Sequence, residues 1–151
     1  MTVEITRRAA LATGIALVGV GPAYAGRGPV YTSWGKAVSG YDVVAYFTES
    51  RPVKGSSSHT ADFQGATWHF ASAANRDLFL SNPDQYAPKY GGFCAYAVGN
   101  GALDVPTVPE AWKIVDGKLY LNYSRGIQST WERRMAGYIA DADRNWARAY
   151  G

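Results

Sequence analysis

The sequence predicts an α+β fold: a small antiparallel sheet of two hairpins, a short helix and a long C-terminal helix. Two observations predict the hairpins, because Gln64-Gly65 and Asp116-Gly117 each separate two short strand-like stretches, as two-residue hairpin turns do. A third observation predicts the long helix, since apolar residues recur at three- and four-residue spacing from Ile127 to Trp146. This order of hairpins and helices is typical of α+β domains.

The N-terminus has the pattern of an export signal. The pair Arg7-Arg8 precedes an apolar run, Leu11 to Val20, that is too short to span a bilayer, and Ala23-Tyr24-Ala25 follows as a small-x-small cleavage site. We therefore expect a signal peptide over residues 1–25 and a periplasmic mature protein. The paired arginines resemble the twin-arginine translocation type, and a general secretory signal or an uncleaved anchor are the alternatives.

The rest of the chain, residues 26–151, has the length of one small domain with a single core. The formal net charge of the whole chain is +3, and its basic residues are scattered rather than clustered, which argues against nucleic acid as a partner. No segment after the signal is apolar enough to span a membrane, so we expect no membrane span in the mature chain. The 11 Tyr and 5 Trp are interpreted as core rings rather than a carbohydrate-binding surface.

Two segments precede the first hairpin. Residues 26–39 are rich in Gly, Pro, Ser and Thr without a clear period, which predicts an extended N-terminal arm. The apolar stretch Asp42 to Phe47 predicts a strand or a buried turn, and Asp42 itself is interpreted as a turn or cap residue. A loop with Pro52, Gly55 and three serines leads from there to the hairpin.

The first hairpin has a predicted register that places its two histidines. A two-residue turn pairs Phe63 with Ala66, Ala61 with Trp68 and His59 with Phe70. Alternation along the strands then puts the aromatic residues on the core face, with His59 at its edge. His69 falls on the outer face, where we expect it to be exposed.

Capping residues mark the starts of two helices. Ser72 is the expected N-cap of a helix over residues 73–80, with Leu78 and Phe79 inward. Ser124 is the expected N-cap of the long helix, which continues to about Tyr150. Trp131 and Trp146 belong to its apolar stripe, so both are predicted to be buried against the sheet.

From Phe70 onward the chain resembles the YHS domain, which has aromatic residues and an Asn-Pro or Asp-Pro step at matching positions. Here these are Phe70, Phe79, Asn82-Pro83 and Tyr86, and Asp42-Val43-Val44-Ala45 resembles the family's opening. The resemblance implies a YHS-like domain over residues 40–151. The family's metal-associated members place cysteines where this chain has other residues, namely Ala45, Ala71 and Asn75. A thiolate site needs several sulfur ligands, so the resemblance does not bring that metal site to this chain.

The chain is more similar to a subgroup of exported, single-domain YHS proteins. The phrases that carry this resemblance are Gly40 to Phe47, Gly65 to Trp68, Tyr90 to Ala97 and Gly117 to Tyr123. Some members of the subgroup have selenocysteine at the position that matches Cys94. The resemblance therefore implies chemistry at this atom, although no established activity comes with the subgroup.

Cys94 is the only cysteine, so it cannot form an internal disulfide. Two glycines, Gly91 and Gly92, precede it, and nearby rings could wall a pocket, namely Tyr90, Phe93 and Tyr96. A catalytic thiol and a buried cysteine that only packs are both compatible with the sequence. We expect Cys94 at the floor of a pocket formed by the Tyr90–Tyr96 loop.

The two histidines are the other candidate metal ligands. On the predicted register His59 and His69 lie on opposite faces, so they cannot both bind one ion unless the register slips by one residue. Either of them with Cys94 could hold Cu(I) or Zn(II). Copper or another soft metal ion is therefore the cofactor that the sequence leaves open.

Three functions remain compatible with these residues. The first is a binding module for a small ligand or a soft metal ion, held through Cys94. The second is a thiol redox enzyme in which Cys94 cycles through a sulfenic acid or a mixed disulfide. The third is an envelope protein that binds a protein partner, with Cys94 serving only for packing.

Overall fold

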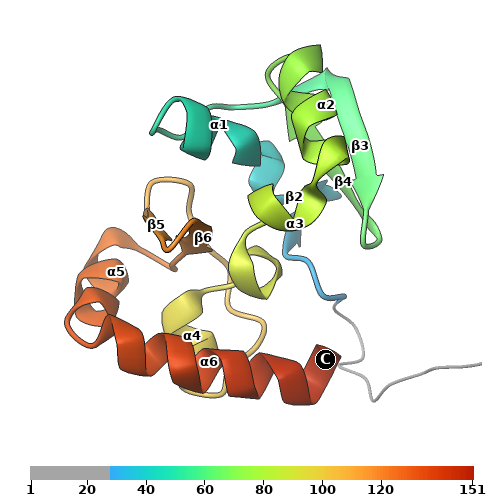
Figure 1. The fold of residues 1–151 in the computed structure, drawn as a ribbon. Coiled ribbons are helices and arrows are strands. Elements are labelled where there is room, and N and C mark those ends of the chain that lie inside the picture. Colours follow the sequence, from blue (N-terminus) through green and yellow to red (C-terminus); the bar gives the residue numbers. More distant parts are fainter. Residues whose placement is uncertain (1–27) are drawn as a thin grey trace, which may run out of the picture.

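The computed structural model describes residues 28–151 and confirms the α+β class (Figure 1). The expected signal peptide lies outside the described residues. The strands are β1 (Thr32–Ser33), β2 (Lys36–Ala37), β3 (Ser56–Phe63), β4 (Ala66–Phe70), β5 (Trp112–Val115) and β6 (Lys118–Leu121). The helices are α1 (Val43–Thr48), α2 (Ala73–Ser81), α3 (Pro83–Tyr86), α4 (Ala95–Gly99), α5 (Arg125–Glu132) and α6 (Met135–Tyr150), with 3-10 turns η1 (Val38–Gly40) and η2 (Lys89–Gly92).

The two predicted hairpins form, but they do not share one antiparallel sheet. β3 and β4 belong to a four-stranded sheet of order β1-β2-β4-β3, whereas β5 and β6 form a separate two-stranded sheet. The larger sheet is mixed, because β2 runs parallel to β4. The turn residues Asp116 and Gly117 both have positive φ, 51° and 76°, as a type I′ hairpin turn requires.

Residues 28–39 pack as part of the domain rather than as an extended arm. β1 and β2 form a short hairpin there, and β2 continues the sheet beside β4. Val30, Ala37 and Val38 are buried in the same core as the sheet. The hydrophobic side chains in this glycine-rich stretch therefore anchor it.

The first hairpin follows the predicted register only near its turn. Phe63 pairs with Ala66 and Ala61 with Trp68, but an irregularity between Ser56 and Thr60 places Ser56, not His59, opposite Phe70. The expected exposure of His69 is also wrong, since only 8% of its surface is exposed. His69 is buried because β4 is an inner strand of the sheet and because Gly55 packs directly against its backbone. A Cβ on Gly55 would lie 2.5 Å from the backbone of His69, so only glycine permits this contact.

The stretch predicted as a strand or a buried turn forms helix α1. Its two valines favour a strand locally, but Asp42 caps the helix by accepting hydrogen bonds from the backbone N–H groups of Val44 (2.9 Å) and Ala45 (3.3 Å). Val43 and Tyr46 are then buried in the core. The cap residue therefore decides the structure of this segment.

Ser72 and Ser124 cap their helices as predicted, by accepting from the N–H groups three residues onward. The long C-terminal helix, however, is two helices, because Arg134 leaves the helical region (φ −142°, ψ 42°) between α5 and α6. Within the predicted apolar faces Phe79 is buried, but Leu78 is 41% exposed.

Two hydrophobic clusters form the core. The sheet cluster joins the larger sheet, α1 and α2, and the helix cluster joins η2, α4, α5 and α6 (Figure 1). β6 lies between them, since Leu119 and Leu121 enter the sheet cluster and Tyr120 enters the helix cluster. This split follows from the alternation of side chains along a strand.

Among residues 28–151, none of the helices combines the length and the apolar character needed to cross a membrane.

Candidate functional site

Cys94 lies where η2 leads into α4, at the N-cap position of that short helix. The turn before it is left-handed, with φ of 60° at Tyr90 and 62° at Gly91. A Cβ on Gly91 would lie 1.7 Å from the carbonyl oxygen of Pro29, so glycine is required for the chain to pass Pro29 here. The Cys94 N–H then donates to the carbonyl of Val105 (3.0 Å), which fixes the residue in the loop.

The sulfur of Cys94 is held between two residues that follow β6. Its thiol donates to Oδ1 of Asn122 (3.6 Å), and the backbone N–H of Tyr123 donates to Sγ (3.3 Å). Both partners lie almost thirty residues further along the chain, so no local pattern could have identified them. These contacts give the sulfur a defined position.

Burial and hydrogen bonds act in opposite directions on this thiol. Cys94 is only 1% exposed, and burial raises the pKa of the thiol above its ordinary value. The backbone N–H groups of Ala97, Tyr123 and Tyr96 lower the pKa in part, because they stabilise a negative sulfur. At neutral pH the thiol is therefore protonated, with donors in place for a thiolate.

Asn122 is the polar side chain that accompanies this sulfur, and it is fully buried. Its Oδ1 accepts from the Tyr96 N–H (3.0 Å) as well as from the thiol. Its Nδ2 has no hydrogen-bond partner among the described residues. A buried amide donor without a partner lowers the stability of the fold.

Cys94 lines an open pocket with a volume of about 470 Å³. The other lining residues are mostly apolar and come from α4, the following loop and the start of α5: Tyr96, Ala97, Asn100, Ala102, Val105, Tyr123 and Ile127. A pocket beside Cys94 is thus present, but Cys94 and Tyr96 are the only residues of the Tyr90–Tyr96 loop that line it. Of the three rings expected to wall it, only Tyr96 does so, because Phe93 is buried in the core and Tyr90 faces another hollow.

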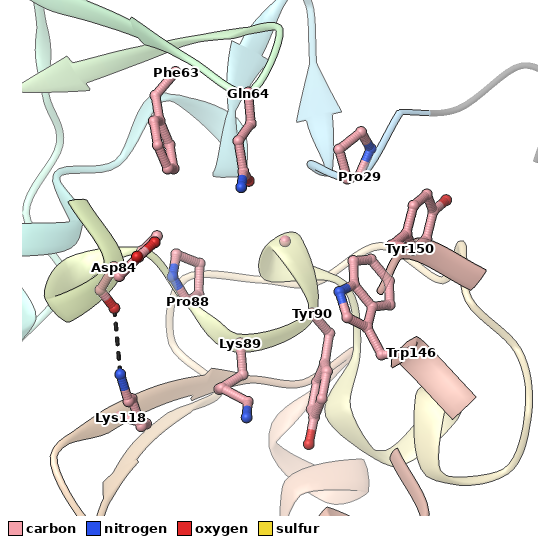
Figure 2. A pocket seen from close by; sticks show the side chains of 12 residues that line it. Pro29, Phe63, Gln64, Asp84, Pro88, Lys89, Tyr90, Lys118, Trp146 and Tyr150 are labelled. Carbon is pink, nitrogen blue, oxygen red and sulfur yellow. Dashed lines mark hydrogen bonds between the residues drawn. The ribbon is translucent and has the colours of Figure 1, made fainter. Parts of the chain in front are cut away.

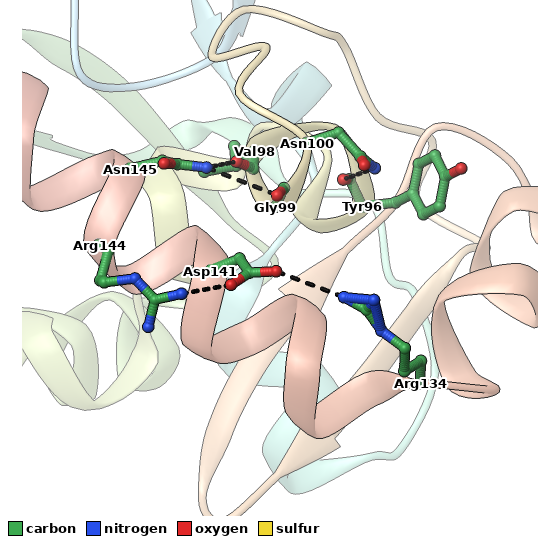
Figure 3. Close-up of polar contacts among 8 residues, drawn as sticks. All are labelled: Tyr96, Val98, Gly99, Asn100, Arg134, Asp141, Arg144 and Asn145. Atoms are coloured by element: carbon green, nitrogen blue, oxygen red, sulfur yellow. Dashed lines mark hydrogen bonds and ion pairs between the residues drawn. The ribbon is translucent and has the colours of Figure 1, made fainter.

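The helix that forms one wall of this pocket is anchored to α6 (Figure 3). Nδ2 of Asn145 donates to the carbonyl of Val98 (2.8 Å) and makes a longer contact with that of Gly99 (3.5 Å). At the C-cap of α4, Nδ2 of Asn100 donates to the carbonyl of Tyr96 (2.9 Å). The carbonyl groups at the end of this one-turn helix are therefore satisfied, and the wall is held in place.

The ion pairs nearby belong to α6 and its start. Asp141 accepts from Arg134 (3.3 Å) and from Arg144, one on each side of it along the chain (Figure 3). All three side chains are substantially exposed, so these pairs contribute little to stability. They add no charged group to the lining of the Cys94 pocket.

The structure does not bring the three candidate metal ligands together. His59 and His69 lie on the larger sheet, and neither lines the Cys94 pocket. Burial lowers the pKa of His69, and the charge of Lys36 lowers it further. Between Gly28 and Gly151 no group of three or more His, Cys, Asp or Glu side chains is placed to hold a metal ion.

The positions of the missing YHS cysteines surround the carboxylate of Asp42. Its Oδ2 accepts from the Ala71 N–H (2.8 Å) and from Nδ2 of Asn75 (2.8 Å), while Oδ1 accepts from the N–H groups that begin α1. Asp42 is fully buried, and these four hydrogen bonds connect α1 to the end of β4 and to α2. The residues present do not fit a thiolate metal site, since hydrogen bonds fill the place of such ligands.

A second hollow, of about 660 Å³, separates the β3–β4 turn from the C-terminal helix (Figure 2). Trp146, predicted to be buried, is instead half-exposed and lines this hollow together with Tyr90. The polar groups near it already have partners: Lys89 pairs with Asp143 (3.0 Å), the Tyr90 hydroxyl donates to the same carboxylate (2.8 Å), and Lys118 donates to the Asp84 carbonyl (3.4 Å).

Comparison with known families finds one match: residues 44–90 match the family model described as YHS domain. This stretch covers most of α1, the β3–β4 hairpin, α2, α3 and the start of η2. The chain is therefore similar to YHS-domain proteins over less than half of its length. No curated protein and no solved structure matches the chain. Cys94 and its pocket lie beyond the matched residues, so the match says nothing about them.

Proposed function

We propose that the protein acts through the Cys94 sulfur as a redox-active thiol. The observation that carries this proposal is the position of Sγ, on the wall of an open pocket and hydrogen-bonded to the Tyr123 N–H. Oxidation to a sulfenic acid adds an oxygen to the sulfur, and a pocket beside it gives room for both the oxidant and that oxygen. Burial raises the pKa of this thiol, and the N–H groups around the sulfur offset part of that rise by stabilising the thiolate, which is the reactive form.

The surroundings of Cys94 favour redox chemistry over a bound metal. A stable soft-metal site uses several sulfur or nitrogen ligands, usually four for structural zinc. The polar groups that contact this sulfur are an amide oxygen and backbone N–H groups, and an N–H group cannot ligate a metal ion. The described chain therefore offers one soft ligand here.

Metal handling is the second candidate, because the YHS domain is associated with metal binding and residues 44–90 match it. On this proposal Cys94 would hold a soft ion such as copper as one ligand, and the remaining ligands would come from a partner or a small molecule. The third function, a structural envelope domain, would leave the pocket and the unpaired Asn122 amide unused.

Hydrogen peroxide and a Cys94→Ser variant separate these functions. We expect the wild-type protein to lose its thiol to peroxide and the variant to be inert, with nearly the same Tm, because a serine hydroxyl can make the same contacts to Asn122 and Tyr123. Oxidised protein is detected by mass spectrometry, and metal content is measured in parallel. One bound Cu(I) ion that is lost in Cys94→Ser would favour metal handling. A thiol inert to both reagents, with a variant destabilised by about 1–3 kcal/mol, would favour packing.

We further propose that the protein is exported to the periplasm. The arginine pair, the short apolar run and the Ala-x-Ala site of residues 1–25 support this proposal. We expect the mature chain to begin at Gly26, which N-terminal sequencing of the periplasmic protein would reveal. Replacing both Arg7 and Arg8 with lysine should retain the precursor in the cytoplasm, and unimpaired export of that variant would indicate the general secretory route.

A further inference from the structure

Two neighbouring hollows form one apolar surface around Tyr123. This residue lines the Cys94 pocket and also a smaller hollow of about 230 Å³, together with Pro106, Thr107 and Val108. Tyr123 and Val108 are 53% and 37% exposed, so both belong to the exposed large apolar side chains of residues 28–151. Exposed apolar groups at the rim of a hollow indicate a binding site for an apolar molecule.

We infer that the oxidant of Cys94 is an organic hydroperoxide, with its apolar group bound along Tyr123 and its peroxide group at the sulfur. The inference deepens the proposed redox function and depends on it. Ala97, Val105 and Ile127 offer an apolar substituent a favourable contact, whereas hydrogen peroxide has no such substituent. The pocket thereby selects the oxidant by its carbon skeleton.

Asn122 supplies the second, independent observation. Its carboxamide contacts Sγ through Oδ1, and its Nδ2, the other end of the same small group, is fully buried and has no acceptor among the described residues. Asn122 does not itself line the pocket, so it acts on the reaction through Sγ and is a positioning residue for the sulfur, whose thiol its Oδ1 accepts from.

The reaction balances without any further reagent. The sulfur attacks the terminal oxygen of R–O–OH, so that an S–O bond forms as the O–O bond breaks. Cys94 is oxidised by two electrons to the sulfenic acid, and the hydroperoxide is reduced to the alcohol. The thiol proton, which Asn122 Oδ1 accepts in the resting state, ends on the alkoxide oxygen.

Cumene hydroperoxide and hydrogen peroxide are the probes that test this inference. The rate of Cys94 oxidation by each is followed by dimedone trapping and mass spectrometry, in the native protein and in the protein unfolded in guanidinium. We expect the ratio of the cumene hydroperoxide rate to the hydrogen peroxide rate to be at least about tenfold higher in the native protein, since only the folded chain has the apolar pocket.

Two matched variants test whether the pocket is responsible. Ile127→Thr makes the wall polar and should lower the native rate ratio severalfold, whereas Leu80→Thr changes an exposed residue of α2 outside the pocket and should leave both rates unchanged. Equal ratios in the native and unfolded protein would overturn the inference and leave the proposed thiol function standing. Failure of both peroxides to oxidise the native thiol would overturn the proposed function itself.

Discussion

Replacing Asp42 with alanine should lower the free energy of unfolding by about 2–5 kcal/mol. The change removes an N-cap of α1, and it also leaves the buried N–H group of Val44, the Ala71 N–H group and the Asn75 amide without their acceptor. A cap alone contributes about 1–2 kcal/mol, and each unsatisfied buried donor costs about 1–3 kcal/mol. Urea denaturation measures the difference, and the loss is large for a small domain.

Asp62 provides the matched control for this variant. It is exposed and accepts one hydrogen bond, from the Thr67 hydroxyl (3.1 Å), so Asp62→Ala should change stability by less than about 1 kcal/mol. Asp42→Asn should also be destabilising, because the amide presents N–H groups where the native carboxylate accepts hydrogen bonds. Unchanged stability of Asp42→Ala would contradict the role of this carboxylate as the connection between α1 and α2.

Trp131→Ala should lower stability by about 3–5 kcal/mol. Trp131 is fully buried in the helix cluster, where its ring lies 5.5 Å from that of Tyr120. Truncation leaves a cavity beneath α5 and removes the contact that joins this helix to β6. The expected result is a Tm lowered by at least about 10 °C in a thermal denaturation experiment.

Two other substitutions show whether the ring volume or the indole N–H is responsible. Trp131→Phe should cost less than the alanine variant, because Nε1 has no hydrogen-bond partner in residues 28–151 and its removal leaves no acceptor unpaired. Trp34→Ala removes a ring that is 95% exposed and should have almost no effect on stability. A Trp131→Ala protein that melts like wild type would mean that α5 does not stabilise the domain.

Local signals in the sequence predicted the elements whose structure is decided locally. The turns at Gln64-Gly65 and Asp116-Gly117 and the caps at Ser72 and Ser124 are all confirmed. Each of these depends on residues within a few positions of one another, so a short pattern contains the relevant interactions.

The predictions that were wrong concern segments whose structure is decided by residues far away in the sequence. The segment after Asp42 is apolar and β-branched, yet its helix depends on a carboxylate that also binds the end of β4. His69 is covered because β2 and Gly55 approach from elsewhere in the chain. The predicted long helix breaks at Arg134, although the apolar spacing continues across this residue from α5 to α6.

Of the candidate site, only the Cys94 sulfur could be predicted from the sequence. Cys94 stands out as the only thiol, and the glycines before it do allow a close approach, although the close group is Pro29 rather than a ligand. Asn122 and Tyr123, which hold the sulfur, follow β6 and reach it only through the tertiary fold. No spacing pattern identifies partners of this kind.

The reaction of native Cys94 with iodoacetamide tests most directly whether this buried sulfur is reached from its pocket. We expect alkylation of the folded protein at a rate that keeps rising above pH 9, because burial raises the pKa of the thiol and only the thiolate reacts. In the unfolded protein the rate should level off near the ordinary thiol pKa of about 8.5, and Cys94→Ala should take up no label. If the native thiol remains unmodified at every pH until the protein unfolds, Cys94 is a packing residue and the proposed chemistry is wrong.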